Sequence, residues 1–103
     1  MTMAAPELTV RQRLVQLITG TLRSSRELAE LAGIPERQVE DHLRHIVRSL
    51  THDRTRRFLL EPSGCRDCGF VFRERTRLTR PSRCPRCKGE AITPPRYGIE
   101  ERT

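Results

Sequence analysis

Four cysteines stand in two matched pairs, Cys65–Cys68 and Cys84–Cys87. Two residues separate the members of each pair, and fifteen residues separate the pairs. Two such knuckles facing each other place four sulfurs at the corners of a tetrahedron, which is the geometry of a structural zinc site. The spacing therefore predicts one zinc ion bound by Cys65, Cys68, Cys84 and Cys87, with no position left for water or substrate. Iron in a rubredoxin-like site has the same ligands and stays open as the alternative.

Two other uses of the cysteines fit the sequence less well. Disulfides belong to oxidising compartments, and the segment Met1–Pro6 has neither the basic region nor the apolar region of a signal peptide. We therefore expect a cytoplasmic protein. A redox-active dithiol of the thioredoxin type needs a βαβ context, and the pattern contains none.

Glycine follows both knuckles, directly at Gly69 and one residue later at Gly89. Glycine tolerates the positive φ that such a turn requires. The second knuckle departs from the first because Lys88 stands where a glycine is expected.

Size and charge narrow the class of protein further. The chain has 103 residues, of which only four are aromatic, so the cysteine half needs a metal to fold. No apolar run reaches the length of a membrane span.

The net charge of +7 lies entirely in residues 54–103, and four thiolates with one Zn²⁺ lower it to +5 there. A basic half favours an acidic partner, with nucleic acid the commonest.

The N-terminal half carries three helical segments. The first opens at Thr9 with Gln12 three residues on, and the second at Ser24 with Glu27 three residues on; both suit a capping box. Gly33 ends the second helix, and the third runs from Pro35 to about residue 50. Apolar residues at helical spacing form the expected buried faces, namely Val10, Leu14, Leu17 and Ile18, then Leu28, Leu31 and Ala32, then Val39, Leu43, Ile46, Val47 and Leu50.

The short connection between the second and third helices indicates a helix-turn-helix, in a slightly rotated, winged form. The outward face of the third helix then presents arginine and glutamine, which contact base edges and phosphate in DNA. The predicted nucleic-acid-binding residues on this helix are Arg37, Gln38, Arg44, His45 and Arg48. His42, His45 and His52 are expected at the surface or half-buried, not as metal ligands.

After Asp53 the pattern becomes extended. We expect strands at 58–62, 70–73 and 90–93 and a last short edge at 97–99. The predicted fold class is α+β, with a three-helix winged helix-turn-helix domain (1–56) followed by a small antiparallel four-cysteine zinc ribbon (57–103). The strand at 58–62 serves both as ribbon strand and as wing. The ribbon residues predicted to contact phosphate are Arg73, Arg75, Arg77 and Arg80.

The whole chain resembles small prokaryotic predicted transcriptional regulators in which a helix-turn-helix is fused to a C-terminal zinc ribbon. The resemblance runs from about Thr9 to Ile99 and is most specific in the ribbon. It is carried by the segments 25–29, 33–34, 58–62, 65–72, 80–87 and 94–97. It implies zinc on the four cysteines and a role in transcription.

The leading hypothesis is a regulator that binds double-stranded DNA, with the third helix in the major groove and ribbon arginines on phosphate. The alternative is a zinc-ribbon adaptor that binds RNA or a protein complex of transcription or translation, with the helix-turn-helix as a docking scaffold. No catalytic constellation is visible, so we do not expect an enzyme. The sequence leaves open whether the protein is a monomer or a homodimer.

Overall fold

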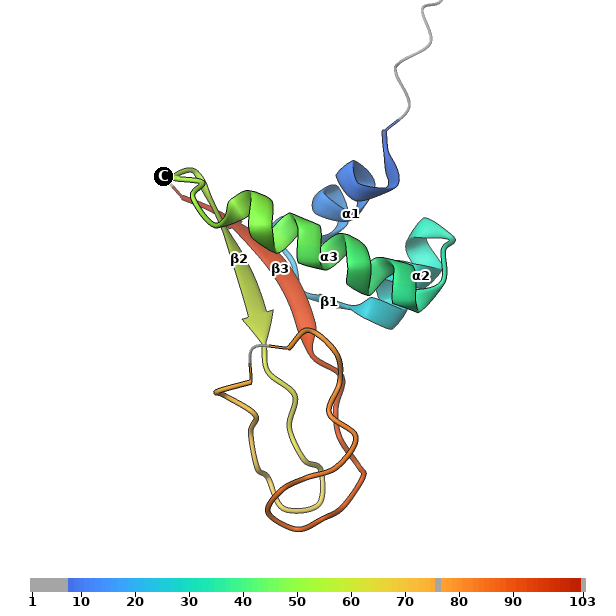
Figure 1. The fold of residues 1–103 in the computed structure, drawn as a ribbon, viewed down its shortest axis with the longest axis vertical. Helices are drawn as coiled ribbons and strands as arrows, with labels where there is room; N and C mark the ends of the chain where they lie inside the picture. Colours follow the sequence, from blue (N-terminus) through green and yellow to red (C-terminus); the bar gives the residue numbers. More distant parts are fainter. Residues whose placement is uncertain (1–7, 76, 103) are drawn as a thin grey trace, which may run out of the picture.

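The computed structural model describes residues 8–75 and 77–102. The first seven residues, which include the start discussed above, and Thr76 and Thr103 lie outside the described part. Three helices stand beside a three-stranded antiparallel sheet, and a long loop carrying the cysteines projects away from it (Figure 1). The helices are α1 (Val10–Ile18), α2 (Ser25–Ala32) and α3 (Glu36–Leu50), and the strands are β1 (Arg23–Ser24), β2 (Arg56–Glu61) and β3 (Arg96–Glu101).

Local capping residues fix where the helices begin. The Thr9 hydroxyl accepts from the Gln12 amide at 3.1 Å, and the Gln12 side chain accepts from the Thr9 amide at 2.9 Å. Ser24 and Glu27 exchange the equivalent bonds at 3.2 and 3.1 Å. These bonds satisfy amides that have no partner inside the helix, and both predicted capping boxes are confirmed. Gly33 ends α2 in the left-handed conformation, as predicted.

One hydrophobic core joins the helices to the sheet. Its buried side chains come from all three helices and from β3: Leu14, Ile18, Leu28, Val39, Leu43, Ile46, Leu50, Tyr97 and Ile99. Removing each of these from water contributes roughly 1.5–3 kcal/mol. The predicted inward face of α3 is confirmed except at Val47, which is only half-buried. The sheet covers the side of the helices that they do not bury against one another.

Two residues assigned to buried faces are exposed. Val10 is 39% exposed and Leu31 is 43% exposed. Both lie on short helices, whose single packed side is already filled by Leu14 and Leu28. The prediction was wrong for Val10 and Leu31, because helical periodicity shows which side of a helix faces the core and does not show how wide the buried part of that side is.

The sheet has the order β1-β3-β2, so the last strand of the chain lies in its middle. Phe58 pairs with Ile99, and Leu60 pairs with Tyr97, which turns these four side chains toward the helices. The prediction that residues 97–99 form an edge was wrong. Within this strand, Tyr97 and Ile99 are buried in the core that the helices form.

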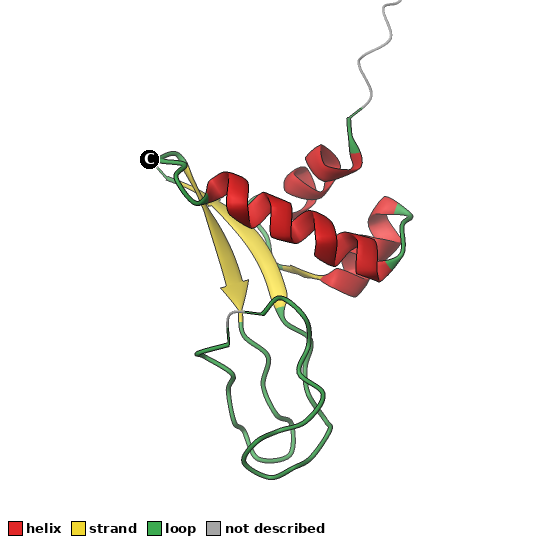
Figure 2. Ribbon diagram, in the orientation of Figure 1, coloured by secondary structure: helices red, strands yellow, loops and turns green. Residues whose placement is uncertain are grey.

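The expected ribbon strands at 70–73 and 90–93 are not continuous strands. Each takes part in a single isolated bridge, Gly64 with Val71 and Cys65 with Ile92, and the rest of this region is loop (Figure 2). The knuckles bend the chain after every few residues, so only one residue pair aligns before the backbones separate. The prediction of strands in these two segments was wrong, because the turns at the cysteines set the path of the backbone and each segment pairs with another at one residue only.

Gly98 leads to a stability prediction. A Cβ at this position would lie 2.8 Å from the Thr21 carbonyl oxygen and 3.0 Å from Leu22 Cδ2. Since backbone cannot move aside cheaply, Gly98→Ala should reduce the free energy of unfolding by about 1–3 kcal/mol. The measurement is thermal and denaturant unfolding of the zinc-loaded protein. Gly64→Ala is the control, because the nearest atoms there are 3.6 Å away; equal effects of the two changes would contradict the account.

Candidate metal centre and basic groove

The first knuckle is closed by two backbone hydrogen bonds. The Cys65 amide donates to the Phe70 carbonyl at 2.7 Å, and the Gly69 amide donates to the Cys65 carbonyl at 2.9 Å. Gly69 has a φ of 80°, in the left-handed region. The turn therefore needs this conformation at the residue after the second cysteine.

The second knuckle repeats both bonds at equivalent positions. The Cys84 amide donates to the Gly89 carbonyl at 2.8 Å, and the Lys88 amide donates to the Cys84 carbonyl at 2.9 Å. Lys88, which replaces the expected glycine, still adopts a φ of 64°. A side chain in this region costs about 1–2 kcal/mol, so the surrounding bonds and the metal hold Lys88 in place.

The four cysteine sulfurs form one compact cluster. All lie within 4.8 Å of one another, and the distances Cys65–Cys87 and Cys68–Cys84 are both 3.6 Å. A tetrahedron with metal–sulfur bonds of about 2.3 Å has sulfurs about 3.8 Å apart, so the donor set fits zinc. Since all four ligands come from the protein, the zinc is structural.

Protonation explains why this cluster needs a cation. Burial opposes ionisation of Cys84, yet the amides of Cys87 and Arg86 and the nearby sulfurs lower its pKa to about 7. For Cys87, the Gly89 amide favours the thiolate, but the Cys65 sulfur and burial raise the pKa to about 12. Four sulfurs this close cannot all be thiolates alone, and a divalent cation removes that conflict.

A small apolar cluster supports the metal centre. Cys65, Cys84 and Ile92 are buried, and Phe70 and Phe72 pack against them. The two rings meet edge to face with centroids 5.0 Å apart. Three buried side chains are too few to hold the ribbon without the metal.

Tyr97 ties the ribbon to the helical core. Its ring is fully buried in the main core, and its hydroxyl donates to the carbonyl of Leu78 in the ribbon. Burial, with the nearby Glu40 carboxylate, raises the pKa of Tyr97 far above its ordinary value, so the hydroxyl stays protonated and donates. Leu78 also packs against the main core. The return arm of the ribbon is thereby anchored beside α3.

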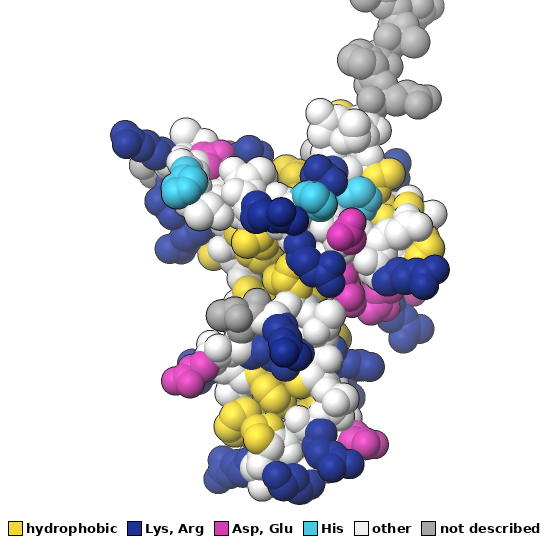
Figure 3. Space-filling model, viewed as in Figure 1, with side chains coloured by type: hydrophobic (Ala, Val, Ile, Leu, Met, Phe, Trp, Pro, Cys, Tyr) yellow, Lys and Arg dark blue, Asp and Glu magenta, His cyan; other side chains and the backbone are white. Residues whose placement is uncertain are grey.

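A basic groove of about 510 Å³ lies at this junction, and we define it by the residues that line it. Its α3 wall and its ribbon wall each contribute arginine and apolar side chains: Arg44, Val47, Arg48, Arg77, Leu78 and Thr79. Figure 3 shows Lys and Arg side chains above and below the hydrophobic surface where the ribbon meets the helices. Helix and ribbon thus present their positive charge to one cleft.

The predicted nucleic-acid-binding residues divide into three groups. The groove brings together Arg44, Arg48 and Arg77. Arg37, Gln38, Arg73 and Arg80 are exposed outside it, and His45 is half-buried. Arg75 is half-buried and donates to the Thr79 carbonyl and hydroxyl at 3.2 and 3.3 Å, so it also holds the loop.

Sequence reasoning missed three residues of the groove. Val47 was assigned to the core, and Leu78 and Thr79 were assigned no role. One signal was available, because Leu78 is the single apolar residue within the segment 75–80. An isolated leucine among arginines and threonines indicates an anchoring point.

Fold and site together define a zinc-ribbon protein whose ribbon is joined to a three-helix domain. Residues 9–59 match the family model described as PF0610-like, N-terminal, and residues 62–102 match the PF0610 rubredoxin-like zinc beta-ribbon domain. The two matches follow each other along nearly the whole chain. The protein belongs with the PF0610-like zinc β-ribbon proteins.

A solved structure is similar over the full length. The solution NMR structure of protein PF0610 from Pyrococcus furiosus matches with a TM-score of 0.74 and 29% sequence identity. The match covers 99% of this chain and 98% of that chain. No curated protein matches the sequence significantly. Within the described residues, no helix is long and apolar enough to cross a membrane.

Removal of zinc tests the metal centre. A chelator should lower the melting temperature and collapse the amide dispersion of residues 64–92, because the ribbon core is too small to persist alone. One equivalent of Zn²⁺ should restore both, and Co²⁺ should give the absorption of a tetrahedral thiolate site. The readouts are ¹H–¹⁵N NMR, calorimetry and optical titration. A metal-free protein with unchanged melting and a dispersed ribbon would contradict the assignment.

Proposed function

We propose that the protein is a DNA-binding transcriptional regulator of the winged helix-turn-helix class, in which the zinc ribbon extends the wing. The order of elements supports this: helix, short strand, two helices, then a hairpin whose second strand lies in the middle of the sheet. In this arrangement α3 is the recognition helix. The loop between β2 and β3 is the wing, enlarged here to residues 62–95.

The basic groove carries the proposal. Arg44 and Arg48 from α3 face the same cleft as Arg77 from the ribbon. Guanidinium groups bind phosphate through paired, charge-assisted hydrogen bonds. A DNA backbone entering the cleft contacts helix and ribbon together, with its sugars against Val47 and Leu78.

The exposed face of α3 supplies the base-reading part of the proposal. Arg37 and Gln38 lie exposed in its first turn, and side chains of these types read guanine and adenine edges in the major groove. Among the residues that the structure describes, Arg44 is held only by an exposed ion pair with Asp41 at 3.6 Å. Such pairs contribute little, so Arg44 can exchange its partner for DNA.

The position of Glu36 removes one objection to DNA binding. A carboxylate at the start of a recognition helix repels phosphate. Here the Ser25 hydroxyl donates to Glu36 Oε2 at 3.0 Å, which ties this side chain to the start of α2. The bond fixes the angle between the two helices and draws the carboxylate to the flank of α3.

The alternative function, an adaptor for RNA or a protein complex, is favoured by one feature of the ribbon. Val71, which lies between Phe70 and Phe72 in the chain, is 37% exposed and gives the ribbon an apolar surface position outside the basic groove. An adaptor that uses this surface has no need of Arg48 or Arg77. Variants in the basic groove therefore distinguish the two functions. Neither function requires catalysis, and we propose no enzymatic activity.

Removing two groove charges tests DNA binding. Arg48→Gln with Arg77→Gln should weaken binding to all duplexes at low salt by about tenfold or more, since two phosphate contacts are lost. The slope of log affinity against log salt should flatten by about two. Fluorescence anisotropy across a salt series measures both.

The matched control is Arg26→Gln with Arg57→Gln, which removes the same charge at exposed ion pairs outside the groove. Its affinity should stay within about twofold of the original.

In addition, Arg37→Ala should change sequence preference by about 1–3 kcal/mol at one base pair. Groove variants that bind like the control would reject the proposed function.

A further inference from the structure

A second groove lies on the other flank of α3. It runs between α1, α3 and the start of β2 and has a volume of about 670 Å³, within the roughly 300–1,000 Å³ of small-molecule sites. Val10, Val15 and Ile46 give it an apolar floor. By the helical periodicity of α3, the residues that line this α1–α3 groove lie on the side opposite those that line the basic groove. The proposed function therefore does not use this second groove.

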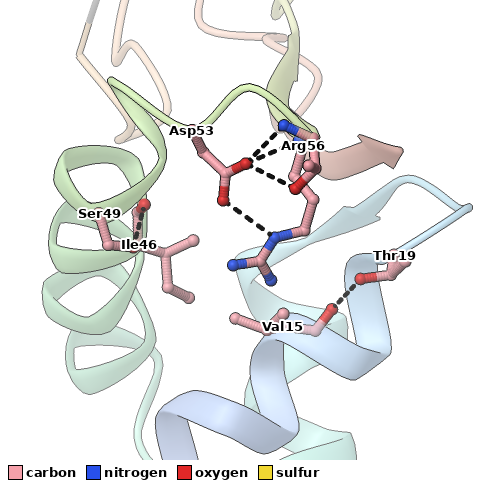
Figure 4. Close-up of polar contacts among 7 residues, drawn as sticks. Val15, Thr19, Ile46, Ser49, Asp53 and Arg56 are labelled. Atoms are coloured by element: carbon pink, nitrogen blue, oxygen red, sulfur yellow. Dashed lines mark hydrogen bonds and ion pairs between the residues drawn. The ribbon is translucent and has the colours of Figure 1, made fainter. Parts of the chain in front are cut away.

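The Asp53 carboxylate positions the Arg56 side chain over this apolar floor. Asp53 Oδ1 accepts from the Thr55 amide and hydroxyl, both at 2.7 Å, and from the Arg56 amide at 3.0 Å. These bonds, with that from Thr55 the strongest, lower the pKa of Asp53 to about 2, so it is ionised at neutral pH. Its Oδ2 accepts from Arg56 Nε at 3.4 Å. Figure 4 shows the Arg56 guanidinium reaching between Ile46 and Val15.

The terminal nitrogens of Arg56 are left for another partner. Within residues 8–75 and 77–102, the hydrogen bonds of the Arg56 side chain involve Nε alone. Arg11 stands on the α1 side of the same groove. None of the described side chains lining it is a carboxylate, and Asp53 behind Arg56 is already engaged. The groove is therefore a positively charged, apolar-floored site.

His42 adds an unsatisfied polar atom. Its Nδ1 is buried and has no hydrogen-bond partner among the described residues, and the ring lines the groove. A buried nitrogen without a partner costs about 1–3 kcal/mol. By contrast, the Ser49 hydroxyl already donates to the Ile46 carbonyl at 2.9 Å. Because His42 Nδ1 is closed to solvent, the rest of the ring, and not Nδ1, offers contact to a ligand in the groove.

From these contacts we propose that the α1–α3 groove binds a small organic carboxylate with an apolar or aromatic body. Its carboxylate pairs with Arg56 and Arg11, and its body lies on Val15 and Ile46 beside the His42 ring. A ligand wedged between α1 and α3 favours one position of α3 over others, and so changes DNA affinity. Only this last consequence rests on the proposed function; ligand binding does not.

The test uses phenylacetate as the probe and phenylacetamide as its neutral match. In ¹H–¹⁵N NMR of the zinc-loaded protein without DNA, phenylacetate should give saturable shifts at Val15, His42 and Ile46. The amide should bind about tenfold more weakly, since it lacks the charge-assisted bonds. Arg56→Gln, and independently the exposed Arg11→Gln, should weaken phenylacetate binding severalfold.

Arg57→Gln is the matched control, because Arg57 is the next residue and pairs with Glu100 on the opposite face of the sheet. It should leave binding unchanged. Equal binding of acid and amide, equal effects of the Arg56 and Arg57 changes, or shifts spread over all arginines would each overturn the proposal. Shifts at the groove that depend on protein concentration without ligand also overturn it, because a second copy then covers the site. Loss of DNA binding in other experiments leaves these readouts untouched.

Discussion

The middle strand of the sheet is the last one in the chain, and the remaining structure depends on that constraint. The chain leaves β2 at Glu61 and must return beside it at Arg96, whose Nε and Nη2 donate to both Glu61 carboxylate oxygens at 2.7 and 2.8 Å. Everything between these residues is a loop whose closure costs entropy. The zinc cluster crosslinks that loop, and Tyr97 anchors its returning arm at Leu78. The ribbon therefore stands beside α3 at a fixed place.

Because of this constraint, α3 borders one groove on each of two opposite sides. On one flank the ribbon arm brings Arg77 to Arg44 and Arg48, and on the other α1 and Arg56 enclose an apolar floor. A single helix thus forms a wall of both the basic groove and the α1–α3 groove. In our account, the first groove takes the DNA backbone and the second a small carboxylate, so binding at one site is linked to the other through the position of α3.

Local chemistry was predictable from the sequence, and long-range pairing was not. Thr9 with Gln12 and Ser24 with Glu27 act within one helical turn, and the cysteine spacing fixes its own knuckles, so these features were found correctly. The central place of β3 depends on pairing with residues far along the chain, which no local pattern encodes. The place of Leu78 and Thr79 beside α3 likewise depends on contacts that are distant in the sequence, since Leu78 packs on the main core and its carbonyl accepts from Tyr97; the isolated leucine alone indicated an anchoring point without its partner. Exposure of Leu31 was missed since periodicity does not show which faces find a partner.

The measurement that tests the central claim most directly is a ¹H–¹⁵N NMR titration of the zinc-loaded protein with a mixed-sequence DNA duplex at low salt. The account predicts that shifts appear together, with one affinity, on residues 44–48 of α3 and 77–80 of the ribbon arm. Shifts confined to the outer ribbon around Val71, or none at all, would contradict it. Helix and ribbon would then not act as one DNA-binding surface.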